Sequence, residues 1–403
     1  MLKRIAIIIG KQFPIPPVNG GAIEQLLYNL IKENELHDDF KLIVYSPYNK
    51  EAESISLSLK NSKIIYIKTD KFHARVKDII GGVINRICKR FYYFGNTYIN
   101  KISKDLKNYS PDIIIVPNIA IYTIKLKKKF PTVPIILHYH NIPKPLPTNF
   151  LNRKVLLSIN HFWGISKFIC NEINKYGNKY GIPTNSSIFY NCFDSNDPLY
   201  DTPITEVQKK IIAHKYKLNL NNKFIIYAGR VQPYKGVKEL IEAFIATSLS
   251  NYNLIIAGSS FFKGSKDDNY MISIKELCKN NNNIIFTGYI KHSELLLLYH
   301  LSNFAVIPSL WEEPFALTCL EPMACAKPVI ISDSGGMIEV PDKESSIIVK
   351  RNADFIPNLT LAINKLAKDE KLCIKMGKAA YNRSRLFTSD IYYKQFKNLI
   401  NNE

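Results

Sequence analysis

The sequence predicts an α/β protein with two doubly wound domains. Short β-branched runs such as IAIIIG and FIIYAG are apolar on both faces, which is typical of parallel strands covered by helices on each side. These runs alternate with longer amphipathic stretches, and the alternation restarts after Asn191. A chain of 403 residues also exceeds one ordinary hydrophobic core, which favours two domains.

We expect the first domain to span residues 1–195 and the second 196–386, with the polar stretch 192–204 as the linker. The last segment, 387–403, is amphipathic and can form a helix that crosses back to the N-terminal domain. Ligands of such folds bind at the carboxyl ends of the strands, so two facing domains would form a cleft. The expected strands are 4–9, 42–45, 64–67, 112–116, 135–140, 162–165 and 188–190, then 224–228, 254–257, 284–286, 304–307 and 329–331.

The composition is that of a globular protein, with 46% hydrophobic and 22% charged residues. No apolar run approaches the roughly 20 residues that a membrane-spanning helix needs. The apolar start is short and soon reaches Gly10, so we expect a buried first strand there and no signal peptide. Seven scattered cysteines without a CxxC pair indicate reduced thiols in a cytoplasm, and neither a disulfide framework nor a metal site.

The net charge of +20 is concentrated in the first half of the chain. Residues 1–195 contain 28 Lys and Arg against 13 Asp and Glu, whereas the remainder contains 26 against 21. This half should meet an anionic partner: a phospholipid surface, a phosphorylated acceptor or nucleic acid. Segment 71–107 interleaves basic and aromatic residues, and Lys127, Lys128 and Lys129 add a second cluster. Such segments can bind an anionic membrane, or they can form a solvated helix face.

Two carboxylates, Glu313 and Glu321, lie eight residues apart in the stretch PSLWEEPFALTCLEPMACAKPVI. Pro314 suits the first position of a helix, so we expect a helix to begin there. Its first amides would be unpaired donors that favour an anion, and both acids could face one ligand. A ligand with hydroxyls at each end and phosphate between them, such as a nucleotide-sugar, fits this arrangement. The amides concerned are those of Phe315, Ala316 and Leu317.

The turn GRVQPYKG follows the expected strand 224–228 and places two cations, Arg230 and Lys235, before a helix beginning near Val237. Fixed cations can stabilise the charge of a departing diphosphate. An exposed basic turn without function is the alternative. Gly258 ends an expected strand and opens a turn that suits a phosphate, although glycines at strand ends are often structural. Gly229, the first residue of the turn GRVQPYKG, is a further candidate for donor binding.

Two further motifs follow strands of the first domain. In NGGAIEQ, Gly20 and Gly21 allow close approach of a ligand to the amides of a helix beginning at Ala22, and a plain helix-initiating turn is the alternative. In ILHYHN, His138 and His140 share one strand face. We expect His140 to reach the cleft and His138 to be satisfied by backbone contacts. Asp267 and Asp268 are expected to be solvated in a loop, not to bind a metal.

The set FPIPPVNGG, ILHYHN, FYNCFD, YAGRVQPYKG and PSLWEEPFALTCLEPMACAKPVI resembles the retaining glycosyltransferases of family 4, which have the GT-B fold. The resemblance runs from Arg4 to about Asp342. The phrases PIPPVNGGAIE, LHYHNIPKPLP and SSFFKGSKDDNY are similar to those of bacterial lipopolysaccharide-core N-acetylglucosaminyltransferases. The resemblance implies metal-independent transfer from a nucleoside-diphosphate sugar with retention of the anomeric configuration.

By matched position, the resemblance implies that Glu321 holds the ribose hydroxyls, while Glu313 and the amides of Phe315 and Ala316 hold the sugar. It implies further that Arg230 and Lys235 hold the diphosphate, that Gly21 approaches it, and that His140 contacts the donor sugar. The chain departs from the family pattern at Pro314 and Ala326, where Gly is frequent. Ala326 then needs a negative φ or some backbone strain.

These observations predict an enzyme that moves a sugar, N-acetylglucosamine or another hexose, from a UDP-sugar to a cell-envelope glycan or glycolipid such as lipopolysaccharide core. Neither a cofactor nor a metal is expected. We expect a cytoplasmic protein that is peripheral on the inner face of the cytoplasmic membrane. A UDP-sugar epimerase of the same fold is an alternative that needs no acceptor. A basic nucleic-acid-binding protein is another, supported only by charge, and it leaves the two glutamates unexplained.

Overall fold

The computed structural model describes residues 2–68, 97–260 and 269–403. Among these residues, none of the helices combines the length and the apolarity that a membrane span requires. The six cysteines of the described part are all buried. Predictions on the following positions lie outside the described residues: most of the basic segment 71–107, Cys88, Asp267 and Asp268.

Packing divides the chain into two compact units. Unit 1 comprises Met1–Cys192 and Ser389–Glu403, and unit 2 comprises Phe193–Thr388. The sequence placed these divisions at residues 195 and 386. Nearly all of the stretch expected as a linker therefore lies in unit 2, where Pro198–Tyr200 forms a short 3-10 turn, η2.

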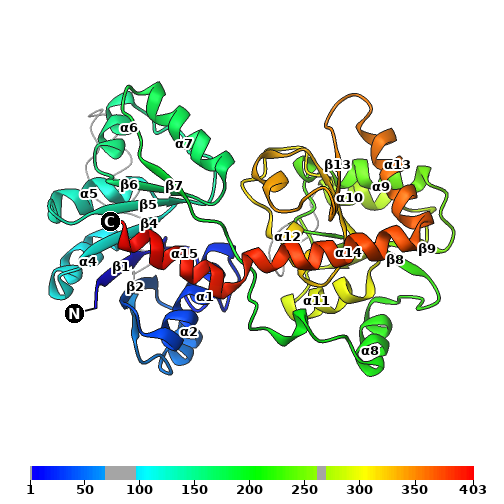
Figure 1. Cartoon of the computed structure of the whole chain (residues 1–403), viewed down its shortest axis with the longest axis horizontal. Coiled ribbons are helices and arrows are strands. Elements are labelled where there is room, and N and C mark those ends of the chain that lie inside the picture. The colour runs from blue at the N-terminus through cyan, green and yellow to red at the C-terminus, as the bar shows by residue number, and fades with distance from the viewer. Residues whose placement is uncertain (1, 69–96, 261–268) are drawn as a thin grey trace. The chain divides into compact units, whose positions relative to one another are not determined.

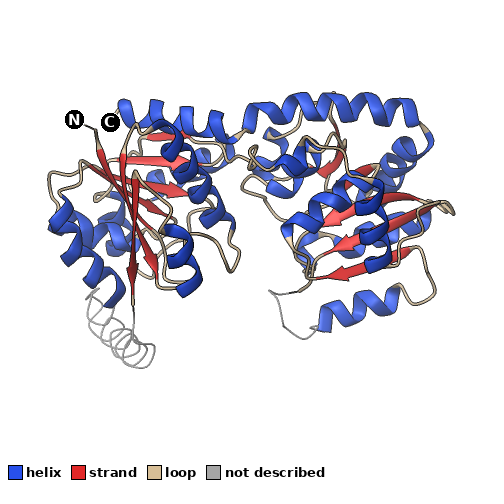
Figure 2. Cartoon of the chain, turned by 90° about the horizontal axis from the view of Figure 1, so that it is seen from below, coloured by secondary structure: helices blue, strands red, loops and turns tan. Residues whose placement is uncertain are grey.

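Unit 1 is built on a seven-stranded, all-parallel sheet with the order β3-β2-β1-β4-β5-β6-β7. The four residues from Ile5 to Ile8 are fully buried, because helices cover both faces of the sheet (Figure 2). Every strand expected in this half is present, and β7 begins and ends two residues earlier than expected. The strands are β1 (Arg4–Ile8), β2 (Lys41–Pro47), β3 (Ser62–Ile67), β4 (Ile113–Pro117), β5 (Ile135–Tyr139), β6 (His161–Gly164) and β7 (Ser186–Ile188).

The last helix, α15 (Ser389–Asn401), packs on unit 1, where it lies beside α1 (Figure 1). Tyr392 stacks on Phe189 at 4.3 Å, and Phe396 meets Trp163 edge-on at 5.9 Å. The helix therefore contributes aromatic residues to the core of this unit. The other described helices of unit 1 are α1 (Ala22–His37), α2 (Lys50–Ser56), α4 (Thr97–Asp105), α5 (Ile121–Lys129), α6 (Asn149–Leu156) and α7 (Lys167–Lys179), with a 3-10 turn η1 (Leu106–Tyr109).

Unit 2 contains a six-stranded parallel sheet with the order β10-β9-β8-β11-β12-β13. This order reverses direction between β8 and β11, the position at which doubly wound sheets bind ligands at their carboxyl edge. The five strands expected here are present. The edge strand β13 was not predicted, because its apolar run is only three residues long and follows a polar segment. The strands are β8 (Lys223–Ala228), β9 (Tyr252–Ala257), β10 (Ile284–Gly288), β11 (Phe304–Ile307), β12 (Val329–Ser332) and β13 (Ser346–Val349).

Helices also cover both faces of the sheet of unit 2 (Figure 2). Helix α9 begins at Val237, as expected from the sequence. The described helices are α8 (Glu206–Tyr216), α9 (Val237–Ala246), α10 (Asn269–Leu277), α11 (His292–Leu301), α12 (Leu317–Ala324), α13 (Phe355–Lys368) and α14 (Glu370–Ser384), with 3-10 turns η3 (Pro233–Lys235), η4 (Gly335–Glu339) and η5 (Arg385–Phe387).

Candidate active site

The centre of the site in unit 2 is an ion pair between Lys235 and Glu313. Lys235 follows β8 and Glu313 follows β11, the two strands that flank the reversal in strand order. The Lys235 Nζ lies 2.6 Å from the Glu313 Oε1, and the Ser309 hydroxyl donates to the same oxygen at 2.6 Å. Glu313 is only 6% exposed, so removal of its cation would leave a buried charge without compensation.

A close approach of backbone brings Lys235 to this position. Gly236 ends the turn η3 with φ 71°, and a Cβ there would lie 1.9 Å from the carbonyl oxygen of Pro308. Only glycine lets the two loops meet at this distance. The Lys235 ammonium also lies over the rings of Trp311 and Tyr234, at 5.2 and 5.8 Å from their centroids. Aromatic faces and a carboxylate thus fix one cation at the end of the sheet.

Arg230, the second predicted cation, lies in the same turn but is exposed. Its guanidinium is 5.9 Å from the centroid of the Tyr234 ring. The Tyr227 hydroxyl donates to the Arg230 carbonyl oxygen at 2.7 Å and so fixes the backbone of the turn. Tyr234 is therefore a shared neighbour of both predicted cations.

The two strand-end glycines, Gly229 and Gly258, meet each other. Their φ values are 147° and 145°, and a Cβ on Gly258 would lie 1.9 Å from the Gly229 carbonyl oxygen. The Gly229 amide donates to the carbonyl oxygen of Ala257 at 3.0 Å. A structural reason for glycine at these positions is therefore present: the backbones after β8 and β9 are in contact.

Two serines that the sequence analysis did not single out hold the loop of Glu313. The Glu313 amide donates to the Ser334 hydroxyl at 2.9 Å, and the Ser332 hydroxyl donates to the Ser309 carbonyl oxygen at 2.6 Å. The Gly336 amide donates to the Glu313 carbonyl oxygen at 2.7 Å. Ser332 is the last residue of β12, which pairs with β11, and Ser334 lies two residues beyond it. Their position at the end of a neighbouring strand was the available signal.

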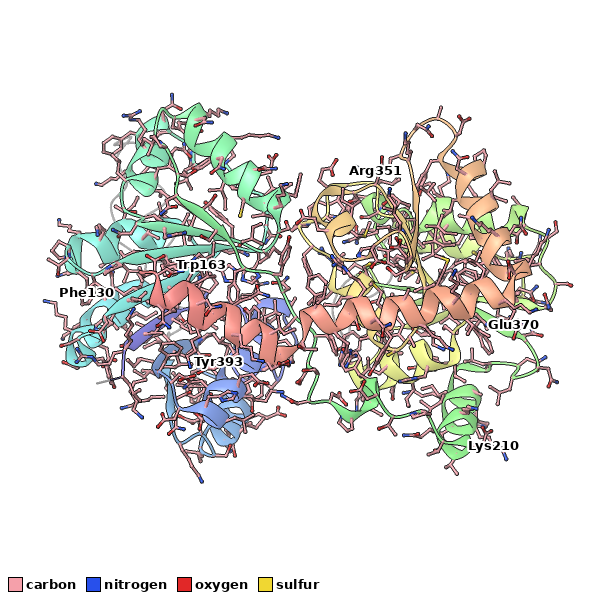
Figure 3. All side chains as sticks on the ribbon, viewed as in Figure 1. Phe130, Trp163, Lys210, Arg351, Glu370 and Tyr393 are labelled. Atoms are coloured by element: carbon pink, nitrogen blue, oxygen red, sulfur yellow. The ribbon has the colours of Figure 1, made fainter. Side chains whose placement is uncertain are left out.

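Arg351 was also missed, although it fixes the same loop from the segment after β13 (Figure 3). Its guanidinium donates to Glu312 Oε1 at 2.6 Å, to Asp333 Oδ1 at 3.2 Å and to the Leu310 carbonyl oxygen at 3.0 Å. Because Arg351 follows a strand that was itself not predicted, its contacts could not be anticipated.

The prediction that a helix begins at Pro314 is wrong. Helix α12 begins at Leu317, and Ala316 precedes it with a left-handed φ of 73°. Phe315 is buried and packs against the Phe387 ring at 5.6 Å, and this burial outweighs the suitability of proline for a first helical turn. The amides without intrahelical acceptors therefore begin at Leu317, whereas those of Phe315 and Ala316 belong to the preceding turn.

Glu321 lies on α12, the helix that follows the Glu313 loop. Its side chain is 14% exposed, and its Oε1 lies 3.1 Å from the Nε2 of His292, the first residue of α11. His292 was not singled out in the sequence, because nothing local distinguishes it from other surface histidines.

In unit 1, helix α1 begins at Ala22, as expected, after two glycines in left-handed backbone conformations. The φ values of Gly20 and Gly21 are 79° and 113°. A Cβ on Gly21 would lie 2.2 Å from the Oε2 of Glu24. Burial raises the pKa of Glu24 above its ordinary value. This carboxyl group beside the glycine turn was not anticipated.

His138 and His140 do share one face of β5, and both are buried. The His140 Nε2 lies 3.2 Å from the His138 Nδ1, so one ring donates to the other. His138 therefore pairs with a side chain, not with the backbone as expected. The His140 amide donates to Asn118 Oδ1 at 2.7 Å, and burial lowers the pKa of His140 to about 3. Its imidazole is therefore neutral at neutral pH.

The residues that the structure describes contain no group of three or more His, Cys, Asp or Glu that could hold a metal ion. The site of unit 2 consists instead of a lysine, an exposed arginine, two carboxylates and the amides of a helix start. Such a set can bind hydroxyl groups and phosphate.

Comparisons with known proteins agree with this chemistry. Residues 208–383 match the family model "Glycosyl transferases group 1". The chain is 25% identical to the putative glycosyltransferase YtcC of Bacillus subtilis, covering 94% of this chain and 86% of that protein. It is 24% identical to the lipopolysaccharide 1,2-N-acetylglucosaminetransferase of Salmonella typhimurium, covering 84% of this chain and 82% of that protein.

Solved structures show the same fold. A glycosyltransferase from Rickettsia africae matches with a TM-score of 0.76 at 17% identity, covering 98% of this chain and 97% of that one. Anabaena Alr3699/HepE in complex with UDP and glucose matches with a TM-score of 0.72 at 16% identity, covering 99% and 100%. The chain is therefore a nucleotide-sugar-dependent glycosyltransferase with the GT-B fold, and residues 208–383 of unit 2 are the part that matches the group 1 model.

Proposed function

We propose that this enzyme transfers a hexose, with N-acetylglucosamine as the first candidate, from a UDP-sugar to a hydroxyl group of a cell-envelope glycan or glycolipid. The proposed reaction needs no metal and retains the anomeric configuration, as in glycosyltransferases of family 4. The observation that carries the proposal is the Lys235–Glu313 pair at the reversal in strand order of unit 2. Cation and carboxylate there suit a diphosphate next to sugar hydroxyls.

The four charged residues of the candidate site in unit 2 divide between the diphosphate and the hydroxyl groups of the donor. Lys235 and Arg230 would bind the diphosphate and take up the negative charge that develops on it. Glu313 would accept hydrogen bonds from hydroxyls of the transferred sugar, and Glu321 from those of the ribose. The first-turn amides of α12, with those of the preceding turn, would complete the polar contacts of the donor.

The residues of unit 1 would contribute shape and neutral hydrogen bonding. Gly21 would let the backbone approach the diphosphate, and His140 would contact the donor sugar. The low pKa of His140, about 3, supports a neutral hydrogen-bonding group and not a cation at this position. The partner His138 would fix which ring nitrogen of His140 carries the proton.

In the proposed reaction the bond between the anomeric carbon and the β-phosphate oxygen breaks, and UDP departs with the electron pair. The acceptor oxygen attacks the same face of the anomeric carbon. The proton of the acceptor hydroxyl passes to the departing phosphate oxygen. Lys235 would make the largest contribution, because stabilisation of developing charge is usually the largest single effect in such reactions.

Two relatives support the choice of donor and acceptor. The structure of the Anabaena protein is a complex with UDP and glucose, and the Salmonella protein is a lipopolysaccharide 1,2-N-acetylglucosaminetransferase. The uneven charge of the chain supports an anionic acceptor or membrane surface. We propose that the enzyme acts in the cytoplasm at the inner face of the membrane, and that nucleic acid is not a partner.

A panel of nucleotide-sugars tests the proposal. Purified enzyme is incubated with UDP-, ADP- and GDP-linked hexoses and a truncated lipopolysaccharide core, with and without EDTA, and released nucleoside diphosphate is measured. We expect release from UDP-sugars only, insensitivity to EDTA, and a product with the anomeric configuration of the donor by NMR. The variant Glu313→Gln should lose turnover. An isomerised sugar formed from donor alone would replace the proposal with an epimerase.

Vesicle binding tests the membrane surface separately. Lys127, Lys128 and Lys129 end α5, and replacing all three with Gln should weaken binding to vesicles of anionic phospholipid about a hundredfold, since each basic residue near the surface contributes about 1 kcal/mol. The matched control replaces three exposed lysines of unit 2. Equal binding by both triple variants, or equal turnover on a neutral oligosaccharide, contradicts this part of the proposal. The control lysines are Lys365, Lys368 and Lys371.

A further inference from the structure

The carboxylate of Glu321 already has a partner in the structure. The Nε2 of His292 lies 3.1 Å from Glu321 Oε1 and joins the start of α11 to α12. The His292 side chain is 51% exposed, whereas that of Glu321 is 14% exposed. The contact therefore joins one oxygen of a nearly enclosed carboxylate to a half-exposed imidazole.

The surroundings of His292 favour its charged form. Partial burial lowers the pKa of His292, but the charge and hydrogen bond of Glu321 and the charges of Asp197 and Asp194 outweigh it, so that the pKa is raised above its ordinary value. The Tyr200 ring lies 6.4 Å from the imidazole. The carboxylates that face His292 thus come both from α12 and from the segment that precedes η2.

The position of His292 has no explanation in helix stability. It is the first residue of α11, where a positive charge opposes the helix dipole and an acidic residue would be preferred. An exposed ion pair contributes little to folding in general. Charged His292 therefore destabilises the start of its own helix. The group that it contacts is Glu321, the carboxylate assigned to the ribose.

We propose that His292 is a positioning residue for nucleotide recognition: it orients the Glu321 carboxylate so that both ribose hydroxyls can donate to it, and it thereby sets the preference for a ribonucleotide. This inference rests on the proposed function, in which Glu321 holds the ribose. A carboxylate can accept two hydroxyl hydrogen bonds only in a restricted orientation of its plane. The hydrogen bond from His292 to Oε1 restricts that orientation before the donor arrives.

Binding of UDP and of 2′,3′-dideoxy-UDP to the full chain, measured by calorimetry, tests the inference. The wild-type protein should prefer UDP by about tenfold or more, because hydrogen bonds to a charged group are lost in the dideoxy compound. His292→Ala should reduce this preference about five- to tenfold, because it weakens the binding of UDP and leaves the binding of the dideoxy compound nearly unchanged. His292→Gln, which can still donate to Oε1, should restore most of it.

Two controls separate the possible outcomes. Lys291→Ala removes the neighbouring exposed cation and should leave the preference unchanged. Glu321→Gln should abolish most of the preference. Equal weakening of both nucleotides in His292→Ala, or no change in either, overturns the positioning role and leaves the proposed function intact. If Glu321→Gln still prefers UDP over the dideoxy compound as the wild type does, Glu321 does not bind the ribose, and the proposed role of His292 is then also wrong.

Discussion

The two units present different chemistry at the carboxyl ends of their parallel strands. In unit 2, the strands β8 and β11 end at a buried ion pair, Lys235–Glu313, that serine hydroxyls and Arg351 hold in place. In unit 1, β1 is followed by a glycine turn, and β5 ends at a pair of neutral, buried histidines. One fold thus supplies fixed charge in one unit, and close backbone approach and uncharged donors in the other.

The difference indicates where catalysis should be most sensitive to substitution. Fixed charges act strongly on a departing diphosphate, whereas a neutral imidazole acts over hydrogen-bond distance only. We therefore expect substitutions at the charged residues of unit 2 to reduce turnover more than substitutions in unit 1.

The largest effect is expected for Lys235→Ala. Turnover should fall about 10²–10³-fold, by analogy with the loss of one preorganised donor from an oxyanion site. Steady-state kinetics with a UDP-sugar measures it, and Lys238→Ala, an exposed lysine that pairs with Glu242 at 3.7 Å, is the matched control. Because Lys235→Ala also leaves Glu313 unpaired, Lys235→Met with Glu313→Gln should recover stability and not turnover. Near-normal turnover in either variant contradicts the assigned role.

The next effect is on stability and compares two glycines of unit 2. Gly258→Ala should lower the free energy of unfolding by about 3–5 kcal/mol, because its Cβ would meet the Gly229 carbonyl oxygen. Gly288→Ala, at φ 67° in open space, should cost only about 1–2 kcal/mol. Denaturant unfolding monitored in unit 2 measures both, and equal losses would show that the backbone contact is not what requires glycine.

Much of the fold could be predicted from sequence, because its signals are local. Runs such as IAIIIG and FIIYAG specify buried parallel strands, and the glycines before Ala22 and Val237 mark helix starts. The edge strand β13 was missed because an edge needs a shorter apolar run than a central strand. The start of α12 was misplaced because Pro314 carries a local preference, whereas the burial of Phe315 against Phe387 depends on residues far away in the sequence.

The candidate site was less accessible to sequence reasoning. Lys235 and Glu313 were each singled out, because both follow expected strands and ligands of doubly wound sheets bind at the carboxyl ends of strands. Their ion pair was not predicted. Ser334, Arg351 and His292 were not, because each acts through a contact with a residue that is distant in sequence. Ser334 lies just after an expected strand, which was a signal, whereas the contacts of Arg351 and His292 depend on how the loops and helices pack.

A smaller effect concerns pH and unit 1. In the folded protein His140 has a pKa of about 3 and is neutral. In the unfolded chain its pKa is the ordinary value for histidine, so as the pH falls the unfolded chain binds a proton that the folded protein does not. Stability from this group is complete above about pH 6.5 and falls as pH decreases, by about 1.4 kcal/mol between pH 7.5 and 5.5. Denaturant unfolding of His140→Gln at both pH values should show a shallower decrease than the wild type. An unchanged slope would contradict burial of a neutral imidazole.

The smallest effect is expected at Ala326, which adopts a left-handed φ of 58° and so takes the strained alternative of the two expected for it. Ala326→Gly should raise the free energy of unfolding by about 0.5–1 kcal/mol, because relief of the left-handed strain exceeds the entropy that glycine adds to the unfolded chain. Thermal melting measures the change. Ala324→Gly, at the last residue of α12, is the matched control and should lower the free energy of unfolding.

The return of α15 to unit 1 has a consequence for biosynthesis. Trp163 and Phe189 acquire their partners Phe396 and Tyr392 only when this helix of thirteen residues has left the ribosome. The half of the molecule that is translated first is therefore the half that matures last, whereas residues 193–388 can fold while translation continues. A nascent chain stalled before Ser389 would expose an aromatic surface to which chaperones can bind. A bulky fusion after α15 would interfere with the folding of unit 1 and not with that of unit 2.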